Sequence, residues 1–282
     1  MNIYDPVSSV GNATSLDLEA IAFSRQKSLD RLTTEAFCIF DFEYAYDIDS
    51  YDAYRRADDA DGEYRCKWPF HYAVAGGWAL ITYPAGALQP IVHNVSVYDA
   101  RTHDEVALVT AFFGLLDRYP DAVPVGWGSE CKEMPTLRRT AATHGLVLPK
   151  RLRDSHPYSR DRIDLSNTLK GQGHFVHMPE YAHATGIPAK PIASKAIGKA
   201  VENGNWDEVR EQVLADVVTT AIIANRYLIS GARVSGDVYA SDAAIFAELA
   251  AAYPQSQWLN LHNRGWDMHR LGQACRGGKV AA

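Results

Sequence analysis

The most informative segment of the sequence is Ala36-Phe37-Cys38-Ile39-Phe40-Asp41-Phe42-Glu43-Tyr44. Its apolar, aromatic-rich run predicts a buried β-strand. Alternate side chains of a strand point to the same face, so Asp41 and Glu43 should leave the strand on one side. Two carboxylates this close repel each other unless a cation neutralises them, and Mg²⁺ and Mn²⁺ are natural partners of all-oxygen sites. By itself, however, Asp-x-Glu more often marks a strand that ends in solvent.

The composition is that of an ordinary globular protein. The chain has 282 residues, of which 47% are hydrophobic and 22% charged, so it can bury a substantial core. It contains no run of 18 apolar residues and no basic-apolar leader at residues 1–10, so we expect no membrane contact. Its four cysteines lie far apart without a Cys-x-x-Cys pair, which favours reduced thiols and a cytoplasmic location.

The charge is unevenly spread along the chain. The formal net charge of −6 argues against a general nucleic-acid coat protein. Acidic residues crowd positions 41–63 and basic residues crowd positions 132–162. An acidic centre beside a basic strip suits a phosphodiester substrate, although both runs are equally compatible with solvated faces.

Periodicity and capping residues predict alternating strands and helices. The expected strands lie at residues 37–43, 72–83, 90–98 and 122–127, with the second and third forming a hairpin. The expected helices lie at residues 15–35, 103–119 after a Thr102 cap, 132–144 ending at Gly145, 164–169, 177–185, from Asn205 or Asp207 to Ile229, 241–253 and 255–271. We expect one α/β domain at residues 37–230, with helical extensions at 1–36 and 231–282, the second packed on the same domain.

Several segments resemble, in order, the motifs of the DEDD (DnaQ-like) superfamily of 3′–5′ exonucleases. Phe40-Asp41-Phe42-Glu43 resembles the first motif, and Ala215-Asp216-Val217-Val218-Thr219-Thr220 resembles the third. The segment at 124–137 is similar to the second motif of the subgroup related to the exonuclease domain of family B DNA polymerases. Ile163-Asp164-Leu165 and the turn Gly186-Ile187-Pro188-Ala189-Lys190 resemble further segments of that subgroup. The resemblance covers about residues 37–227, and the order of the pieces makes it far more specific than any single piece.

The resemblance implies a fold and an activity. The implied fold is α/β, with a ribonuclease H-like mixed five-stranded sheet flanked by helices and extra helices at both termini. The implied activity is metal-dependent hydrolysis at the 3′ end of single-stranded DNA or RNA, using two divalent ions, Mg²⁺ or Mn²⁺, about 4 Å apart. The implied metal ligands are Asp41, Glu43, Glu133 and Asp216. A polymerase or another replication or repair protein is a candidate partner.

The sequence departs from the family pattern at functional positions. Glu133 stands where the second motif has Asp, and Lys132 stands where it has Phe; Glu130 is a rival for the ligand role of Glu133. Gln212 replaces the Tyr before the last Asp, and Glu211 occupies the place of the His of the other branch. We count Gln212 among the catalytic candidates because its side chain can still orient a water. The alternatives are a catalytically impaired exonuclease fold that binds nucleic acid or a protein partner without cleaving, and a hydrolase of small nucleotides.

Four further residues are candidates for substrate binding. Phe42, Tyr44 and Trp127 could stack on or wedge terminal bases, and Lys190 could bind the backbone. For Phe42 a place in the core is the better-supported alternative, and for Trp127 both alternatives stay open. Lys190 equally suits a solvated face.

Overall fold

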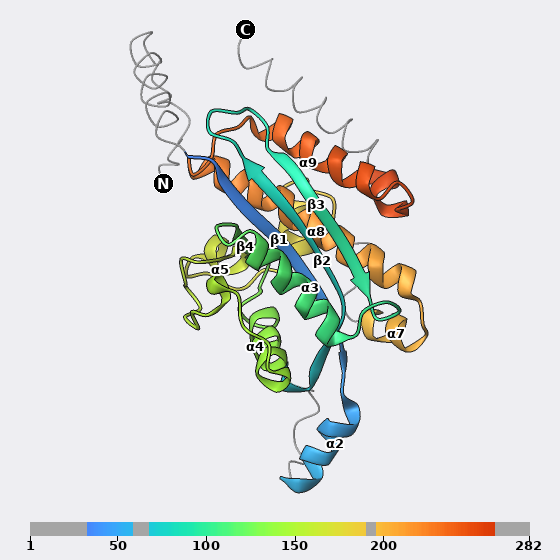
Figure 1. Ribbon diagram of the computed structural model, residues 1–282. Coiled ribbons are helices and arrows are strands. Elements are labelled where there is room, and N and C mark those ends of the chain that lie inside the picture. Colours follow the sequence, from blue (N-terminus) through green and yellow to red (C-terminus); the bar gives the residue numbers. More distant parts are fainter. Residues whose placement is uncertain (1–32, 59–67, 190–195, 263–282) are drawn as a thin grey trace, which may run out of the picture.

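The structure is a computed structural model that describes residues 33–58, 68–189 and 196–262 (Figure 1). The helix expected at 15–35 lies almost entirely outside these residues, and Glu35 itself begins a strand. Lys190 also lies outside them. The helix expected at 255–271 is helical over 257–262, and the rest of it lies beyond the described part.

A mixed five-stranded sheet forms the centre of the protein, with the strand order β3-β2-β1-β4-β5. The strands are β1 (Glu35–Tyr46), β2 (His71–Tyr83), β3 (Ile91–Asp99), β4 (Val123–Gly126) and β5 (Ile163–Asp164). β1 pairs antiparallel with β2, which pairs antiparallel with β3, whereas β4 runs parallel to both β1 and β5. This confirms the expected α/β fold class and the expected hairpin. The sequence did not reveal β5, because a strand of two residues has no periodicity to detect.

Helices cover both faces of the sheet (Figure 1). The helices are α2 (Ile48–Ala57), α3 (Glu105–Arg118), α4 (Glu133–His144), α5 (Leu165–Lys170), α6 (Met178–Ala184), α7 (Ile197–Glu202), α8 (Trp206–Ser230) and α9 (Val238–Ala252), with 3₁₀ turns at Trp68–Phe70 and Lys150–Leu152. α3 and α4 lie over one face, and α8 lies over the other. β1 is thus buried on both sides, which explains its nearly continuous apolar run.

The central strand β1 sends alternate side chains into two different cores. Phe37 and Ile39 enter the core that α8 covers, which we call the α8-side core. Cys38, Phe40 and Phe42 enter the core that α3 and α4 cover, the α3-side core. Because side chains alternate along a strand, Asp41 belongs to the face of Phe37 and Ile39. The first acid of the pair therefore faces α8.

Capping residues define where the main helices begin and end. α3 begins after Asp104, whose side chain accepts a hydrogen bond from the Ala107 N–H at 2.8 Å. The expectation of a Thr102 cap is wrong, because the Thr102 hydroxyl instead donates to the carbonyl of Asp99. α4 ends at Gly145 with φ of +68°, as expected, since glycine tolerates this left-handed conformation. α8 begins after Asn205, one of the two expected starts.

α8 is the longest helix and lies against the sheet. It is the one helix in the described part of the chain that is long and apolar enough to cross a membrane, but 78% of its apolar window is buried within the protein. Its apolar character is therefore that of a core helix.

A buried polar network joins α9 to α8. Asp242 accepts hydrogen bonds from Asn225 Nδ2 at 2.7 Å and from Arg226 Nε at 2.8 Å, and the hydroxyl of Tyr83 donates to Asn225. Burial is the largest influence on the pKa of Asp242 and raises it, although the Arg226 guanidinium opposes this. α9 thus packs on α8, and the division of the chain into a domain with helical extensions stays a prediction.

Candidate metal centre

Three carboxylates from distant parts of the sequence meet between β1 and α8. One ligand oxygen from each of Asp41, Glu43 and Asp216 lies within 4.8 Å of the other two. Glu43 and Asp216 are buried and Asp41 is half-buried. An all-carboxylate donor set of this size and burial fits a hard divalent cation, which would cancel the mutual repulsion of the charges. The fold therefore brings together carboxylates from two segments that lie far apart in the sequence.

Gln212 supports the third carboxylate from one turn earlier on α8. Its Nε2 donates to Asp216 Oδ2 at 2.8 Å, and its side chain is fully buried. This i, i+4 contact follows directly from helical geometry. The amide that replaces the expected tyrosine thus holds Asp216 in place.

Glu133 begins α4 beside the three carboxylates but is not part of the group within 4.8 Å. It is buried, and burial is the main reason why its pKa is raised to about 8. The charges of Glu43 and Asp164 raise this pKa further, while Lys132 lowers it. Glu133 is therefore a neighbour of Glu43 that holds its proton in the absence of a cation.

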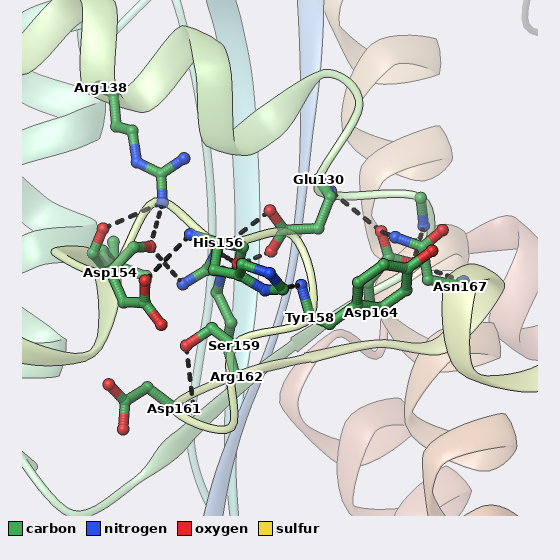
Figure 2. A network of polar contacts seen from close by, with 12 residues as sticks. Glu130, Arg138, Asp154, His156, Tyr158, Ser159, Asp161, Arg162, Asp164 and Asn167 are labelled. Atoms are coloured by element: carbon green, nitrogen blue, oxygen red, sulfur yellow. Dashed lines mark hydrogen bonds and ion pairs between the residues drawn. The ribbon is translucent and has the colours of Figure 1, made fainter.

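Glu130, the other candidate for the ligand role of Glu133, forms an ion pair with Arg162 (Figure 2). Its carboxylate accepts from both Nε and Nη2 of Arg162, and the two side chains are only 6% and 3% exposed. Arg162 also donates to the carbonyls of Asp154 and His156 at 2.7 and 2.8 Å. Since Arg162 engages both carboxylate oxygens, Glu130 is a structural residue, and Glu133 stays the predicted second-motif acid.

Asp164 fixes the loop that leads to Glu133 (Figure 2). Its two carboxylate oxygens accept hydrogen bonds from the backbone N–H groups of Gly128 and Glu130 at 2.9 and 3.0 Å. The same carboxylate caps α5 by accepting from the Asn167 N–H. Sequence reasoning placed Asp164 in a family segment but did not find this role, and the only available signal was an acid at the start of a short helix.

The substrate-binding candidates occupy different environments. Phe42 is 2% exposed and packs edge-on against Phe112 in the α3-side core, so its ring is not presented to a base. Tyr44 is also buried in the α3-side core, and its pKa is raised by burial and then by the charges of Glu133, Asp41 and Glu43. Trp127 is half-buried on the ring of Tyr181, with the ring centres 5.4 Å apart.

The turn before Lys190 is tied to the helix that carries Asp216. The Thr219 hydroxyl donates to the Pro188 carbonyl at 2.8 Å. The indole N–H of Trp258 donates to the Ala189 carbonyl at 2.9 Å. The hydrogen bond from Thr219 therefore anchors the end of the 186–189 turn to α8.

Much of the basic strip at 132–162 has structural partners. Guanidinium groups of Arg138, Arg151 and Arg153 donate to backbone carbonyls of neighbouring loops. Arg139 pairs with Glu105, and Arg162 pairs with Glu130. The crowding of basic residues in the sequence therefore reflects loop anchoring and does not itself mark a phosphate-binding surface.

The Glu211 carboxylate of α8 binds the segment at 256–258. Its carboxylate accepts hydrogen bonds from the Ser256 hydroxyl and from the backbone N–H groups of Gln257 and Trp258. It thus caps the helical turn at 257–262 and takes no part in the carboxylate group.

Comparison with known proteins gives one family and two solved structures. The family described as "Predicted 3'-5' exonuclease related to the exonuclease domain of PolB" matches residues 67–266, more than half of the chain. The family B DNA polymerase of Pyrobaculum calidifontis is 16% identical, with a TM-score of 0.48 over 84% of this chain and 29% of that chain. E. coli Exonuclease I in complex with an oligonucleotide is 13% identical, with a TM-score of 0.41 over 71% of this chain and 41% of that chain. The chain thus spans less than half of either protein, and no curated protein matches it.

Proposed function

Because the chain belongs to the family of predicted 3′–5′ exonucleases related to the exonuclease domain of PolB, we propose that it is a metal-dependent 3′–5′ exonuclease. Its substrate is the 3′ end of single-stranded DNA or RNA. The observation that carries the proposal is the group formed by Asp41, Glu43 and Asp216, whose ligand oxygens lie within 4.8 Å of one another. Phosphoryl transfer requires positioning and charge stabilisation more than covalent chemistry from the protein, and this group is suited to that task.

The residues that would hold two divalent ions, Mg²⁺ or Mn²⁺, are Asp41, Glu43 and Asp216, with Glu133 as the fourth carboxylate. When bound, such ions supply an activated water and stabilise charge on the phosphate. Glu133 must release its proton to join them, since a carboxylic acid is a poor ligand. Gln212 holds Asp216 through its hydrogen bond but cannot act as a general base.

A degradation assay tests this function. Single-stranded DNA and RNA with a 5′ label are incubated with the protein and either Mg²⁺ or Mn²⁺. We expect a ladder of products shortened from the 3′ end, which disappears in Asp41→Ala. Asp117→Ala is the matched control, because it removes an exposed carboxylate at the end of α3 and should leave the ladder intact. The absence of cleavage by the unaltered protein with either metal refutes the proposal.

The second candidate function is binding of nucleic acid or a protein partner without cleavage. It is favoured by the position of Glu133, which lies outside the three-carboxylate group and holds its proton with a pKa of about 8. The same oligonucleotides, retained by the protein but left intact with both metals, would support it. A polymerase or another replication or repair protein remains the proposed partner, and the cytoplasm the proposed location.

A further inference from the structure

Lys132 was not among the candidate site residues, yet the structure places it beside them. It immediately precedes Glu133, at the position that caps α4, and is half-buried. Its ammonium lies 4.5 Å from the ring centre of Tyr44. Among the described residues, this ammonium makes no hydrogen bond or ion pair. Its direct contact there is with the face of the Tyr44 ring.

The ring that holds Lys132 belongs to the residue that directly follows Glu43 on β1, and it packs in the α3-side core. The Tyr44 hydroxyl is buried, with no hydrogen-bond partner among the described residues. Burial raises the pKa of Tyr44, and Glu133, Asp41 and Glu43 raise it further. The charge of Lys132, in turn, is the strongest influence that lowers the pKa of Glu133. The contact between Lys132 and Tyr44 thus joins the residue that precedes Glu133 to the residue that follows Glu43.

The chemistry of this contact leaves the ammonium able to bind an anion. An ammonium carries three N–H donors and no acceptor, and an aromatic face attracts its charge without using up all the donors. The neighbouring arginines of the second-motif region are already bound to carbonyls or carboxylates. Lys132 is thus a cation that is held on the Tyr44 ring, has kept hydrogen-bonding capacity and is next to Glu133 in the chain. The anion that an exonuclease brings to this place is a phosphodiester.

We propose that Lys132 binds a non-bridging oxygen of the substrate phosphate beside the carboxylate group, with the Tyr44 ring setting the position of its ammonium. This inference rests on the proposed exonuclease function and adds a substrate-binding residue to it. The residue occupies the place of the phenylalanine in the related motif, so the contact is a property of this chain. It supplies positive charge to a site whose other side chains are acidic.

Oligonucleotide binding tests the contact without requiring cleavage. All proteins carry Asp41→Asn so that the strand stays intact, and affinity for a labelled single-stranded DNA is measured across a range of salt concentrations in Mg²⁺. Lys132→Met keeps an apolar stem on Tyr44 but removes the charge. We expect it to weaken binding roughly tenfold, as for the loss of one hydrogen bond to a charged group. The slope of log affinity against log salt should become shallower by about 0.7, the value for one phosphate contact on a single strand.

A matched control separates this contact from a general loss of charge. Lys150→Met removes an exposed ammonium from the 3₁₀ turn at Lys150–Leu152, after the far end of α4. We expect its affinity and its salt slope to equal those of the parent protein. An equal effect of both substitutions overturns the specific contact.

Steady-state kinetics on proteins that retain Asp41 give a second measure. Lys132→Met should raise KM by about tenfold with a much smaller change in kcat, because the contact is made in the ground state and the transition state alike. Lys132→Arg should restore part of the loss, since a guanidinium also donates to phosphate. A purely structural role would instead lower kcat through Glu133 and leave the salt slope unchanged.

The outcomes distinguish this inference from the function on which it rests. If the unaltered protein degrades strands while Lys132→Met keeps the parent salt slope and KM, Lys132 does not bind substrate and the exonuclease function stands. If the unaltered protein neither binds nor degrades strands, both fail together.

Discussion

At the scale of single residues, Glu133 combines a functional position with an unfavourable environment. Burial, and the charges of Glu43 and Asp164, raise its pKa to about 8. Its longer side chain replaces an aspartate in the related motif, and a displaced carboxylate can cost on the order of 10² in rate. A bound divalent cation would reverse the electrostatic penalty, because it favours the ionised form.

This environment makes the stability of the metal-free protein depend on pH through Glu133. The unfolded chain releases this proton near its ordinary pKa of 4.5, whereas the folded chain keeps it up to about 8. The free energy of unfolding should therefore fall as the pH rises from about 4.5 to about 8 and stay low above that. Urea denaturation in the presence of a chelator, at pH 5.5 and 8.5, measures the fall.

Glu133→Gln should flatten this pH dependence, because the amide has no proton to retain. Glu202→Gln, an exposed substitution on α7, should leave the slope as it is in the parent protein. Identical pH slopes for the parent and Glu133→Gln would show that Glu133 does not hold its proton.

At the scale of elements, the loop between β4 and α4 depends on partners from the β5 region. Arg162 pairs with Glu130 through two nitrogen donors, and Asp164 accepts the N–H groups of Gly128 and Glu130 (Figure 2). Asp164 of the two-residue strand β5 and the preceding Arg162 thus hold the loop that leads to Glu133.

Arg162→Met should destabilise the protein by roughly 3–5 kcal/mol, because it leaves the Glu130 carboxylate buried and unpaired. The double variant Glu130→Met/Arg162→Met should recover part of this loss, since no isolated charge remains. Urea denaturation of the single and double variants measures both values. A single variant as stable as the parent would show that the pair is not buried in solution.

Arg153→Met provides the comparison for a surface arginine. Its guanidinium donates to the Leu148 carbonyl at an exposed position, so its loss should cost far less than that of Arg162.

At the scale of the whole molecule, the candidate metal centre joins the first described strand, β1, to α8, which lies far along the chain. Asp41 and Glu43 lie on the central strand, and Asp216 lies on the helix that covers it. A cation held by the carboxylates of Asp41, Glu43 and Asp216 binds only the folded chain, because folding brings residues 41 and 216 together. Metal binding should therefore stabilise the entire fold.

Mn²⁺ or Mg²⁺ should raise the melting temperature in a concentration-dependent way. At a concentration 100 times the Kd, the expected stabilisation is about 2.7 kcal/mol. Asp216→Asn should abolish the increase, and Asp117→Asn should retain it. Thermal denaturation without nucleic acid measures the effect, and an equal increase in both variants would place metal binding elsewhere. We also expect Mn²⁺ to support faster cleavage than Mg²⁺, because Mg²⁺ demands stricter geometry.

The sequence by itself determined the strand that carries the acids, the hairpin, the long helix and the family. These follow from local periodicity, from caps such as Gly145, and from motif order along the chain. The tertiary structure added that Arg162 engages Glu130 and that the Lys132 ammonium lies on the Tyr44 ring, and it confirmed the core position that the sequence favoured for Phe42. Those outcomes depend on partners such as Arg162, Phe112 and Tyr44, which lie tens of residues away in sequence. Local periodicity and capping patterns depend on neighbouring residues, so they do not predict which distant side chain will contact a given carboxylate, ring or ammonium.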